Sequence, residues 1–148
     1  MKKYMSLQNK LKSFMSGKID AQKSAGEAFM NINKDKPGVV TLPEGIQYEI
    51  LKDGTGAQPT IASKVKAHYK GALLDGKEFD SSFKRNEPFT APLRALIKGW
   101  QIVIPMMKEG SHWRIWIPSD LAYGDRGAGS DIPGGATLMF EVELLAVL

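Results

Sequence analysis

The feature that most constrains the fold is a change of hydrophobic period at Pro37. The preceding segment lacks proline, and its apolar or small residues recur at alternating spacings of three and four, the pattern of a helix with a heptad seam. The seam positions are Tyr4, Leu7, Leu11, Phe14, Lys18, Ala21, Ala25, Ala28 and Ile32. After Pro37 apolar and polar residues mostly alternate, as in half-buried strands. The sequence therefore predicts a helical arm over residues 1–36 and a β-rich domain over residues 37–148.

Two questions about the arm stay open at this point. Gly17 and Gly26 each weaken a helix by about 1 kcal/mol relative to alanine. Gly17 followed by Asp20 also fits a helix stop and a new N-cap, so one long helix and two short ones are both compatible. The seam either packs on the chain's own domain or forms an arm that associates with a second copy or holds a substrate. We favour the arm, because the helix precedes a complete domain.

The second part is predicted to be α+β. Alternating segments over residues 46–51, 65–69, 113–117 and 138–144 predict strands, and turn dipeptides such as Asp75-Gly76 follow apolar runs. The only helical stretch in this part is short, over residues 92–97, with Pro92 at its start. The sequence therefore predicts a meandering antiparallel β-sheet wrapped against one short helix.

Charge and composition exclude several partners. Residues 1–36 hold eight of the 20 basic residues and three of the 16 acidic ones, so the net charge of +4 comes from the arm, and a solvated helix face explains it better than nucleic-acid binding. The absence of cysteine excludes disulfides and thiol nucleophiles.

The start of the chain bears on its location. No apolar run approaches the roughly 18 residues of a membrane span, and Met1-Lys2-Lys3 is not followed by an apolar signal core. We expect a cytoplasmic protein as the chain stands, and a periplasmic or cell-envelope protein if the start is processed or trimmed.

Short motifs for cofactors fail in this chain. Residues 71–77 match a phosphate-binding loop, but Glu78 replaces the required Ser or Thr, and Asp75-Gly76 is typical of a hairpin turn. His68 and His112 lack metal-ligand spacing and are predicted to be ordinary strand residues. We expect no metal and no cofactor.

Aromatic residues gather at predicted strand ends and loops. Each of them is by itself typical of a core, but Phe79 follows a turn, Trp100 follows the short helix, and Tyr123 stands beside a glycine-rich loop, which are places where sites are built. The full set is Tyr69, Phe79, Phe89, Trp100, Tyr123 and Phe140, with Ile97 and Ile132.

Five ordered motifs in residues 44–148 resemble the FKBP-type peptidyl-prolyl cis-trans isomerases. They are Ala67-His68-Tyr69-Lys70-Gly71, Phe79-Asp80-Ser81-Ser82 with Arg85 and Pro88-Phe89, Ile97-Lys98-Gly99-Trp100, Ala122-Tyr123-Gly124, and Ile132-Pro133 followed by Ala136-Thr137-Leu138-Met139-Phe140. Residues 26–48 further resemble the bacterial branch related to macrophage infectivity potentiator, in which a helical N-terminal part dimerises.

The resemblance implies a fold, a site and an activity. The fold is an antiparallel sheet curled around one short helix, with the site in the cleft between them. The site residues that the resemblance implies are Trp100 as the floor, Tyr69, Phe79, Phe89 and Phe140 as the walls, Leu96 and Ile97 as the ligand-holding backbone, Tyr123 as a donor to a ligand carbonyl, Ile132 at the loop edge, and Asp80, which either pairs with Arg85 or faces the twisting amide. The implied partners are proline-containing or unfolded chains and macrolide inhibitors.

The chain departs from the family pattern in three places. Residues 125–131 lack a histidine that some members have, Ala95 stands where many have a carboxylate, and Pro105 is less usual. These departures affect the expected substrate preference more than the activity. The first hypothesis is an enzyme that isomerises X-Pro bonds during folding, and the alternative is a non-catalytic proline-peptide-binding or chaperone module that uses the same cleft.

Overall fold

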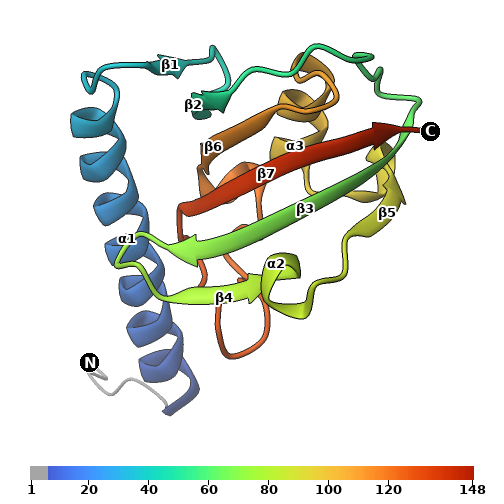
Figure 1. Cartoon of the computed structure of the whole chain (residues 1–148). Coiled ribbons are helices and arrows are strands. Elements are labelled where there is room, and N and C mark those ends of the chain that lie inside the picture. The colour runs from blue at the N-terminus through green and yellow to red at the C-terminus, as the bar shows by residue number, and fades with distance from the viewer. Residues whose placement is uncertain (1–6) are drawn as a thin grey trace, which may run out of the picture.

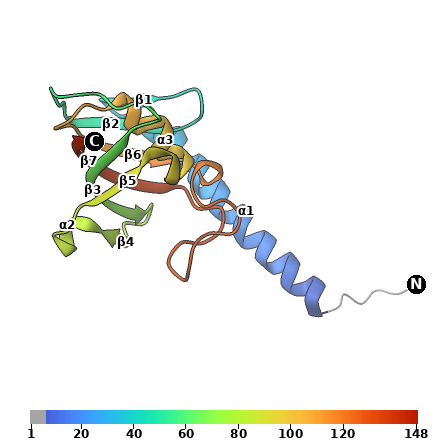
Figure 2. The ribbon, with the colours of Figure 1, turned by 90° about the vertical axis from the view of Figure 1, so that its right-hand side faces the viewer.

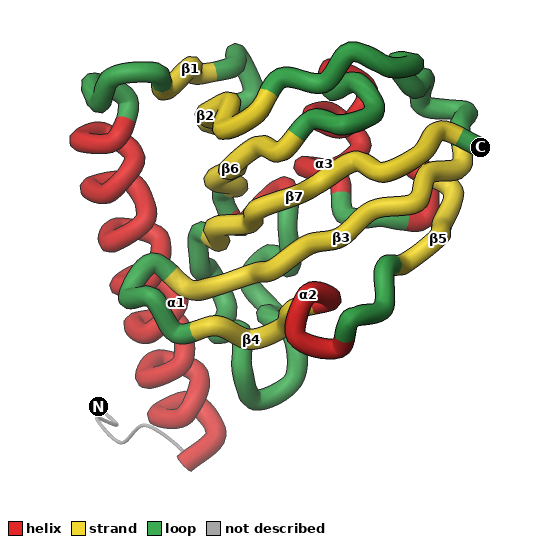
Figure 3. Tube along the Cα trace, in the orientation of Figure 1, coloured by secondary structure: helices red, strands yellow, loops and turns green. Residues whose placement is uncertain are grey.

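The computed structural model of the chain describes residues 7–148. Tyr4 of the seam lies outside these residues, and so does Met1-Lys2-Lys3, on which the predicted location depends. In chain order the elements are α1 (Leu7–Asn33), β1 (Val39–Thr41), β2 (Gln47–Lys52), β3 (Lys64–Leu73), β4 (Glu78–Ser81), α2 (Ser82–Arg85), β5 (Phe89–Pro92), the 3₁₀ turn η1 (Leu93–Ala95), α3 (Lys98–Val103), η2 (Ile104–Met106), β6 (His112–Ile117), η3 (Ser119–Leu121) and β7 (Leu138–Val147) (Figures 1 and 3).

The N-terminal segment forms one long helix, α1. Gly17 lies inside it, so the helix does not stop there. The helix runs past the ends of the strands, and its N-terminal turns project beyond the domain (Figures 1 and 2). The seam positions Leu7, Leu11, Phe14 and Ile32 are 74%, 53%, 62% and 68% exposed. The seam therefore does not pack on the chain's own domain.

A second face of α1 docks on the domain. This face contains Gly26 and Asn33, which are buried, and Phe29, whose ring centroid lies 6.4 Å from that of Trp116 on β6. The Asn33 side chain donates to Gln47 Oε1 at 2.8 Å, and Gln47 donates to the Met30 carbonyl at 2.9 Å. The C-terminal turns of α1 are thus fixed to the sheet.

The sheet is antiparallel, as predicted, but it is not a meander. Its strand order is β1-β2-β6-β7-β3-β4, with β5 also pairing with β3. The two long strands β3 and β7 pair over nine positions, from Val65 with Val147 to Leu73 with Leu138. Because β3 pairs with β7, β4 and β5, strands distant in sequence lie together at the centre of the sheet.

The short helix begins later than predicted. Residues 92–97 are helical only in part: Pro92 ends β5, Leu93–Ala95 form the 3₁₀ helix η1, and Leu96 and Ile97 have extended backbone, with ψ of 167° and 152°. Ile97 is the N-cap of α3, so α3 itself spans residues 98–103. The apolar spacing of residues 93–97 reflects burial beside the sheet rather than a helical period.

The core lies between the sheet and α3. Alternation along β6 and β7 buries one set of side chains, and α3 adds Trp100 and Val103. The largest fully buried hydrophobic side chains are aliphatic: Ile46, Leu93, Ile104, Met107, Ile115, Ile117, Leu138 and Leu144.

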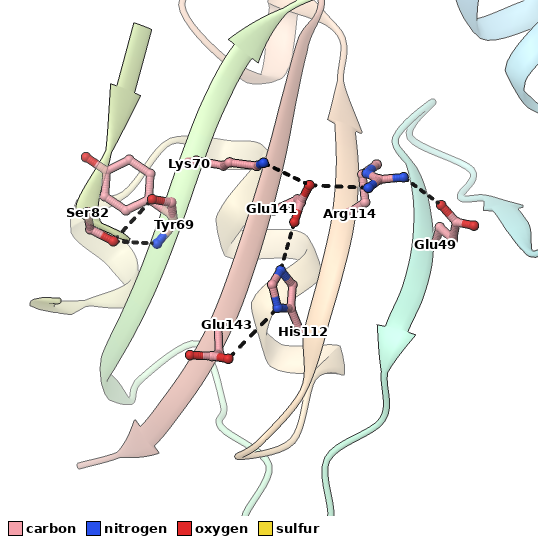
Figure 4. A network of polar contacts seen from close by, with 8 residues as sticks. All are labelled: Glu49, Tyr69, Lys70, Ser82, His112, Arg114, Glu141 and Glu143. Atoms are coloured by element: carbon pink, nitrogen blue, oxygen red, sulfur yellow. Dashed lines mark hydrogen bonds and ion pairs between the residues drawn. The ribbon is translucent and has the colours of Figure 1, made fainter. Parts of the chain in front are cut away.

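The opposite set of side chains on these strands forms a polar network (Figure 4). Glu141 accepts from His112 Nε2 at 3.0 Å and from Arg114 at 3.3 Å, and Lys70 Nζ lies 3.5 Å away. Partial burial favours the neutral form of Glu141, but Lys70, His112 and Arg114 outweigh it and hold the pKa of this carboxyl below its ordinary value. The polar face and the apolar face therefore follow directly from strand alternation.

Candidate functional site

A pocket of about 550 Å³ opens between the sheet, α3 and the loop that follows β6. Strand residues form one side, the segment before α3 and Trp100 form the base, and residues of the loop form the other side. The lining residues are Tyr69, Phe79, Asp80, Phe89, Ala95, Leu96, Ile97, Trp100, Tyr123, Ala128, Asp131, Ile132 and Phe140.

Aromatic rings fix the base of the pocket. The Trp100 ring is 6% exposed and lies edge-on to Tyr69 and Phe140, with centroid distances of 5.3 and 5.2 Å. Phe89 lies 5.6 Å from Trp100 and edge-on to Tyr69 at 5.5 Å. Edge-to-face contacts of this kind are favourable and hold each ring in one orientation. The base is therefore apolar and rigid.

Gly71 makes room for two of these rings. Phe79 and Phe140 meet edge-on with their centroids 5.8 Å apart, directly over Gly71 of β3. A Cβ at position 71 would lie 2.7 Å from Phe79 Cε1 and 2.8 Å from Phe140 Cε1, closer than real Cβ atoms approach. Glycine at this position thus allows both rings to reach the pocket.

Asp80 is the acidic side chain of the strand side. One carboxylate oxygen accepts a hydrogen bond from the Tyr69 hydroxyl, and the other accepts one from Arg85, with which it also forms an ion pair. Partial burial favours the neutral carboxyl, but these two donors outweigh it and lower the pKa of Asp80. Burial and the bond to Asp80 raise the pKa of Tyr69, so its hydroxyl stays protonated. Both Asp80 oxygens are therefore engaged by other side chains of the protein.

The single helical turn α2 carries Arg85 and also contacts the backbone of Tyr69. Ser81 caps α2 by accepting from the Lys84 amide at 3.2 Å, and Asn86 ends it in the left-handed region with φ of 50°. The buried Ser82 hydroxyl accepts from the Tyr69 amide at 2.7 Å and donates to the Tyr69 carbonyl at 3.1 Å. This single turn of helix therefore fixes the backbone of Tyr69 on β3 (Figure 4).

The segment before α3 presents a free backbone donor to the pocket. Gln101 Nε2 donates to the Leu96 carbonyl at 2.6 Å, which holds Leu96 and Ile97 in extended form. Ile97 accepts from the amides of Trp100 and Gln101, while its own N–H has no hydrogen-bond partner within residues 7–148. A ligand carbonyl can therefore bind there.

The loop side supplies one hydroxyl. Tyr123 is 39% exposed, and burial, followed by the charge of Asp80, raises its pKa. Its hydroxyl makes no hydrogen bond to another described residue, so it is available to a ligand. Ile132 is buried at the tip of the loop, where Ala128 and Ile132 exchange backbone hydrogen bonds of 2.9 and 3.1 Å. The loop thus places a donor and an apolar edge opposite the strands.

The structure brings together ten of the eleven predicted site residues, and Arg85 stands beside them, bound to Asp80. Three lining residues were not predicted: Ala95, Ala128 and Asp131. Two are small and one is exposed, so no hydrophobic pattern marks them. Within residues 7–148 no three His, Asp or Glu side chains converge as metal ligands.

Two family models match the chain. One, described as FKBP-type peptidyl-prolyl cis-trans isomerase, matches residues 56–145, and the other, described as the domain amino terminal to it, matches residues 1–50. Among the helices of residues 7–148, none combines the length and the apolar character that crossing a bilayer requires.

Curated relatives and solved structures agree with these matches. The peptidyl-prolyl cis-trans isomerase Mip of Coxiella burnetii is 46% identical over 86% of this chain and 55% of its own length. The outer membrane protein MIP of Legionella longbeachae is 42% identical over 88% of this chain and 56% of its own. The chain thus spans about half the length of these relatives.

Similarity to solved structures extends over the described fold. The crystal structure of FkpA from Escherichia coli has a TM-score of 0.86 and 33% identity, covering 99% of this chain and 75% of that one. A peptidyl-prolyl cis-trans isomerase from Pseudomonas syringae has a TM-score of 0.81 and 42% identity, covering 86% of this chain and 94% of that one.

Proposed function

The chain belongs to the FKBP-type peptidyl-prolyl cis-trans isomerases, and from this membership we propose that it catalyses rotation about X-Pro bonds in flexible or unfolded polypeptides. The observation that carries the proposal is the apolar pocket: its aromatic base fits a pyrrolidine ring, and unpaired donors lie on two sides of it.

The pocket suits this reaction because the barrier arises from amide resonance. Rotation about the bond costs on the order of 20 kcal/mol, and the uncatalysed reaction takes tens to hundreds of seconds. A twisted amide has lost its resonance and is less polar at its carbonyl than the planar form. An apolar, water-poor pocket therefore favours the twisted state over the planar one, which is differential binding of the transition state.

Two donors hold the substrate on either side of the rotating bond. We assign the Tyr123 hydroxyl and the Ile97 backbone N–H to carbonyls that flank the proline, because both residues line the pocket and neither group is used within the described protein. Fixing the flanking carbonyls restricts the rotation to one bond. The step needs no covalent intermediate, since no bond to the protein forms or breaks.

Asp80 is assigned an indirect part in this proposal. Both of its oxygens are engaged by Tyr69 and Arg85, so its ionised carboxylate fixes the Tyr69 ring against Trp100. Its charge also remains close enough to Tyr123 to affect the pKa of that hydroxyl. We propose that Asp80 positions the wall and contributes to the electrostatic field at the pocket.

The test is catalysed isomerisation of a short Leu-Pro-Phe peptide, with rapamycin as competitor and Phe79→Ala as the pocket variant. We expect acceleration that both the competitor and the substitution abolish. Rapamycin binding without acceleration would favour the alternative, a non-catalytic proline-binding module. Absence of both binding and acceleration would overturn the assignment of the pocket.

We further propose that the exposed seam of α1 pairs with a second copy of the chain. The support is the row of exposed apolar side chains on the projecting part of α1 and the matched amino-terminal family domain. In sedimentation, Leu11→Glu with Phe14→Glu should yield monomers, while Lys10→Glu with Lys12→Glu should not. Deletion of residues 1–33 is unsuitable, because residues 26–33 pack on the sheet. A parent chain that sediments as a monomer would refute the proposal.

We propose a location in the cell envelope, on the name of one relative, the outer membrane protein MIP of Legionella longbeachae. Fractionation of cells that produce the native gene product checks this. Recovery with a cytoplasmic marker protein rather than with the envelope fraction would contradict it.

A further inference from the structure

The base of the pocket loop rests on α1. We call residues 119–137, between β6 and β7, the pocket loop. Gly26 of α1 lies so close to Thr137 that a Cβ at position 26 would overlap Thr137 Oγ1 and lie 3.0 Å from its Cβ. One and two turns towards the N-terminus, Lys23 Nζ lies 2.8 Å from Asp125 Oδ1, and Ile19 lies against Gly134 and Gly135. Three successive turns of α1 thus contact the pocket loop (Figure 2).

The contacts are tight at Gly134 and Gly135. A Cβ at position 134 would lie 3.2 Å from Ile19 Cγ1 and 2.8 Å from the Asp125 carbonyl carbon. A Cβ at position 135 would lie 2.7 Å from the Ile19 carbonyl oxygen. The returning limb of the loop is therefore held between α1 on one side and the outgoing limb on the other. A cavity of about 450 Å³ borders this contact beside Gly26, Gly135 and Thr137, but a methyl group at position 26 points at Thr137 itself and must displace it.

Backbone hydrogen bonds connect this base to the pocket. Gly135 donates to the Gly124 carbonyl at 2.9 Å, joining the two limbs directly beside Tyr123. Gly127 donates to the Tyr123 carbonyl at 3.1 Å, and Ala128 pairs with Ile132 at the tip. Because the limbs are bonded to each other at both ends, a shift at residues 134–137 moves Tyr123 and Ile132 with it.

We propose that Ile19 and Gly26 of α1 are positioning residues for the isomerase reaction. They touch no substrate, and they act by setting where the pocket loop holds Tyr123 and Ile132 opposite the strands. The inference rests on the proposed function for its catalytic part, while its structural part, the coupling of α1 to the loop, stands independently. On this proposal the docked part of α1 belongs functionally to the catalytic domain.

A pair of glycine substitutions on the same helix tests the proposal. Gly26→Ala places a methyl group against Thr137, whereas Gly17→Ala meets nothing within 4 Å. Both changes raise helix propensity equally. We expect Gly26→Ala to lower kcat/KM for the Leu-Pro-Phe peptide by about tenfold, as small misplacements of binding groups do, and Gly17→Ala to leave it unchanged. Adding Thr137→Ala to Gly26→Ala should restore most of the loss, which general destabilisation would not allow.

A second pair keeps the test decisive if Gly26→Ala does not fold. Ile19→Ala removes the side chain that contacts Gly134 and Gly135, and Ile32→Ala removes an exposed seam side chain. We expect the first alone to lower kcat/KM and to shift the amide resonances of Gly127, Ala128 and Ile132. Equal effects within each pair, or unmoved loop amides in folded Ile19→Ala, would overturn the inference. If the parent chain lacks isomerase activity, the proposed function fails, and the amide shifts still decide the coupling.

Discussion

The two sides of the pocket are built in different ways. The strand wall, formed by Tyr69, Phe79, Asp80, Phe89 and Phe140, is held by contacts among its own side chains, namely edge-to-face rings and the bonds from Tyr69 and Arg85 to Asp80. The loop wall, formed by Tyr123, Ala128, Asp131 and Ile132, is held by backbone hydrogen bonds, by glycines and by α1.

Because of this difference, we expect substitutions in the two walls to affect folding stability and the position of the binding groups to different degrees. Side chains of the strand wall belong to the main core or touch it, so a change there costs folding free energy as well as activity. In the loop wall Ile132 belongs to the core and Ala128 packs against it, but Tyr123 and Asp131 are more exposed, so a change at either of these two alters the position of binding groups with a small effect on global unfolding. Substitutions matched across the two walls test this distinction.

The largest effect is expected at the base shared by both walls. Trp100→Ala should lower the free energy of unfolding by about 3–5 kcal/mol, because it removes a buried ring that contacts Tyr69, Phe89 and Phe140. It should also abolish isomerase activity. Urea unfolding followed by circular dichroism measures the first, with Phe83→Ala as control, because this ring stacks on His68 at the surface and lies outside the core. Stability close to that of the parent would show that Trp100 is not a main support of the strand wall.

The two walls also differ in how well the sequence predicted them. Aromatic residues at strand ends and the family motifs identified the strand wall. Large aromatic side chains at such places can be recognised from the sequence alone as candidates for a pocket. In the loop wall, Tyr123 and Ile132 were predicted, but Ala128 and Asp131 were not. Their place in the pocket comes from the tight backbone turn between Ala128 and Ile132, which side-chain patterns do not encode.

The same limit explains why the docking face of the arm and the bounds of the short helix were not predicted. The seam of α1 could be predicted because most of its residues are apolar, although the structure leaves it exposed. The docking face was not predicted, because it includes Gly26 and Asn33, which a search for apolar residues does not find. Gly26 was interpreted as a weak point of the helix, yet the close approach to Thr137 requires it. Leu96 and Ile97 fitted a helical period, but tertiary contacts, including the Gln101 bond to the Leu96 carbonyl, hold them extended.

The next largest effect is a loss of activity that we expect from a steric clash within the loop wall. Gly127 has φ of +69°, and a Cβ there would overlap the Ile132 carbonyl oxygen, whereas Gly129 has φ of +55° and open space around it. Both alanine substitutions incur about 1–2 kcal/mol of backbone strain, but only Gly127→Ala must also displace Ile132. We expect kcat/KM to fall about tenfold for Gly127→Ala and much less for Gly129→Ala. Equal losses would mean that strain rather than placement matters.

A smaller effect distinguishes the acidic residues of the two walls by pH. Asp80 has a lowered pKa in the folded state, so its ionised form stabilises the fold above the unfolded-state pKa of about 4, and this contribution is lost as pH falls through the folded-state value. At pH 7, Asp80→Asn should lower the free energy of unfolding by about 1 kcal/mol, allowing for solvent screening of a partly exposed pair. Chemical unfolding at pH 7 and pH 3 should show the difference shrinking on acidification.

Asp131→Asn is the matched control on the loop wall. Asp131 forms no hydrogen bond or ion pair with any residue in the range 7–148, so its substitution should leave stability unchanged at both pH values. A pH-independent difference for Asp80→Asn would show that its bonds to Tyr69 and Arg85 do not depend on the charge.

The smallest effect is expected from single hydroxyl groups, and it separates the walls most sharply. Tyr123→Phe removes a hydroxyl with no partner among the described residues, so stability should stay constant while kcat/KM falls about threefold, the value of one modest hydrogen bond to substrate. Tyr69→Phe removes the donor to Asp80 and should lower stability as well. Because the pKa of each tyrosine is raised, both hydroxyls stay protonated near neutral pH, and kcat/KM should be flat between pH 6 and pH 8. A loss of stability in Tyr123→Phe equal to that in Tyr69→Phe would show that the loop wall is as deeply integrated into the fold as the strand wall.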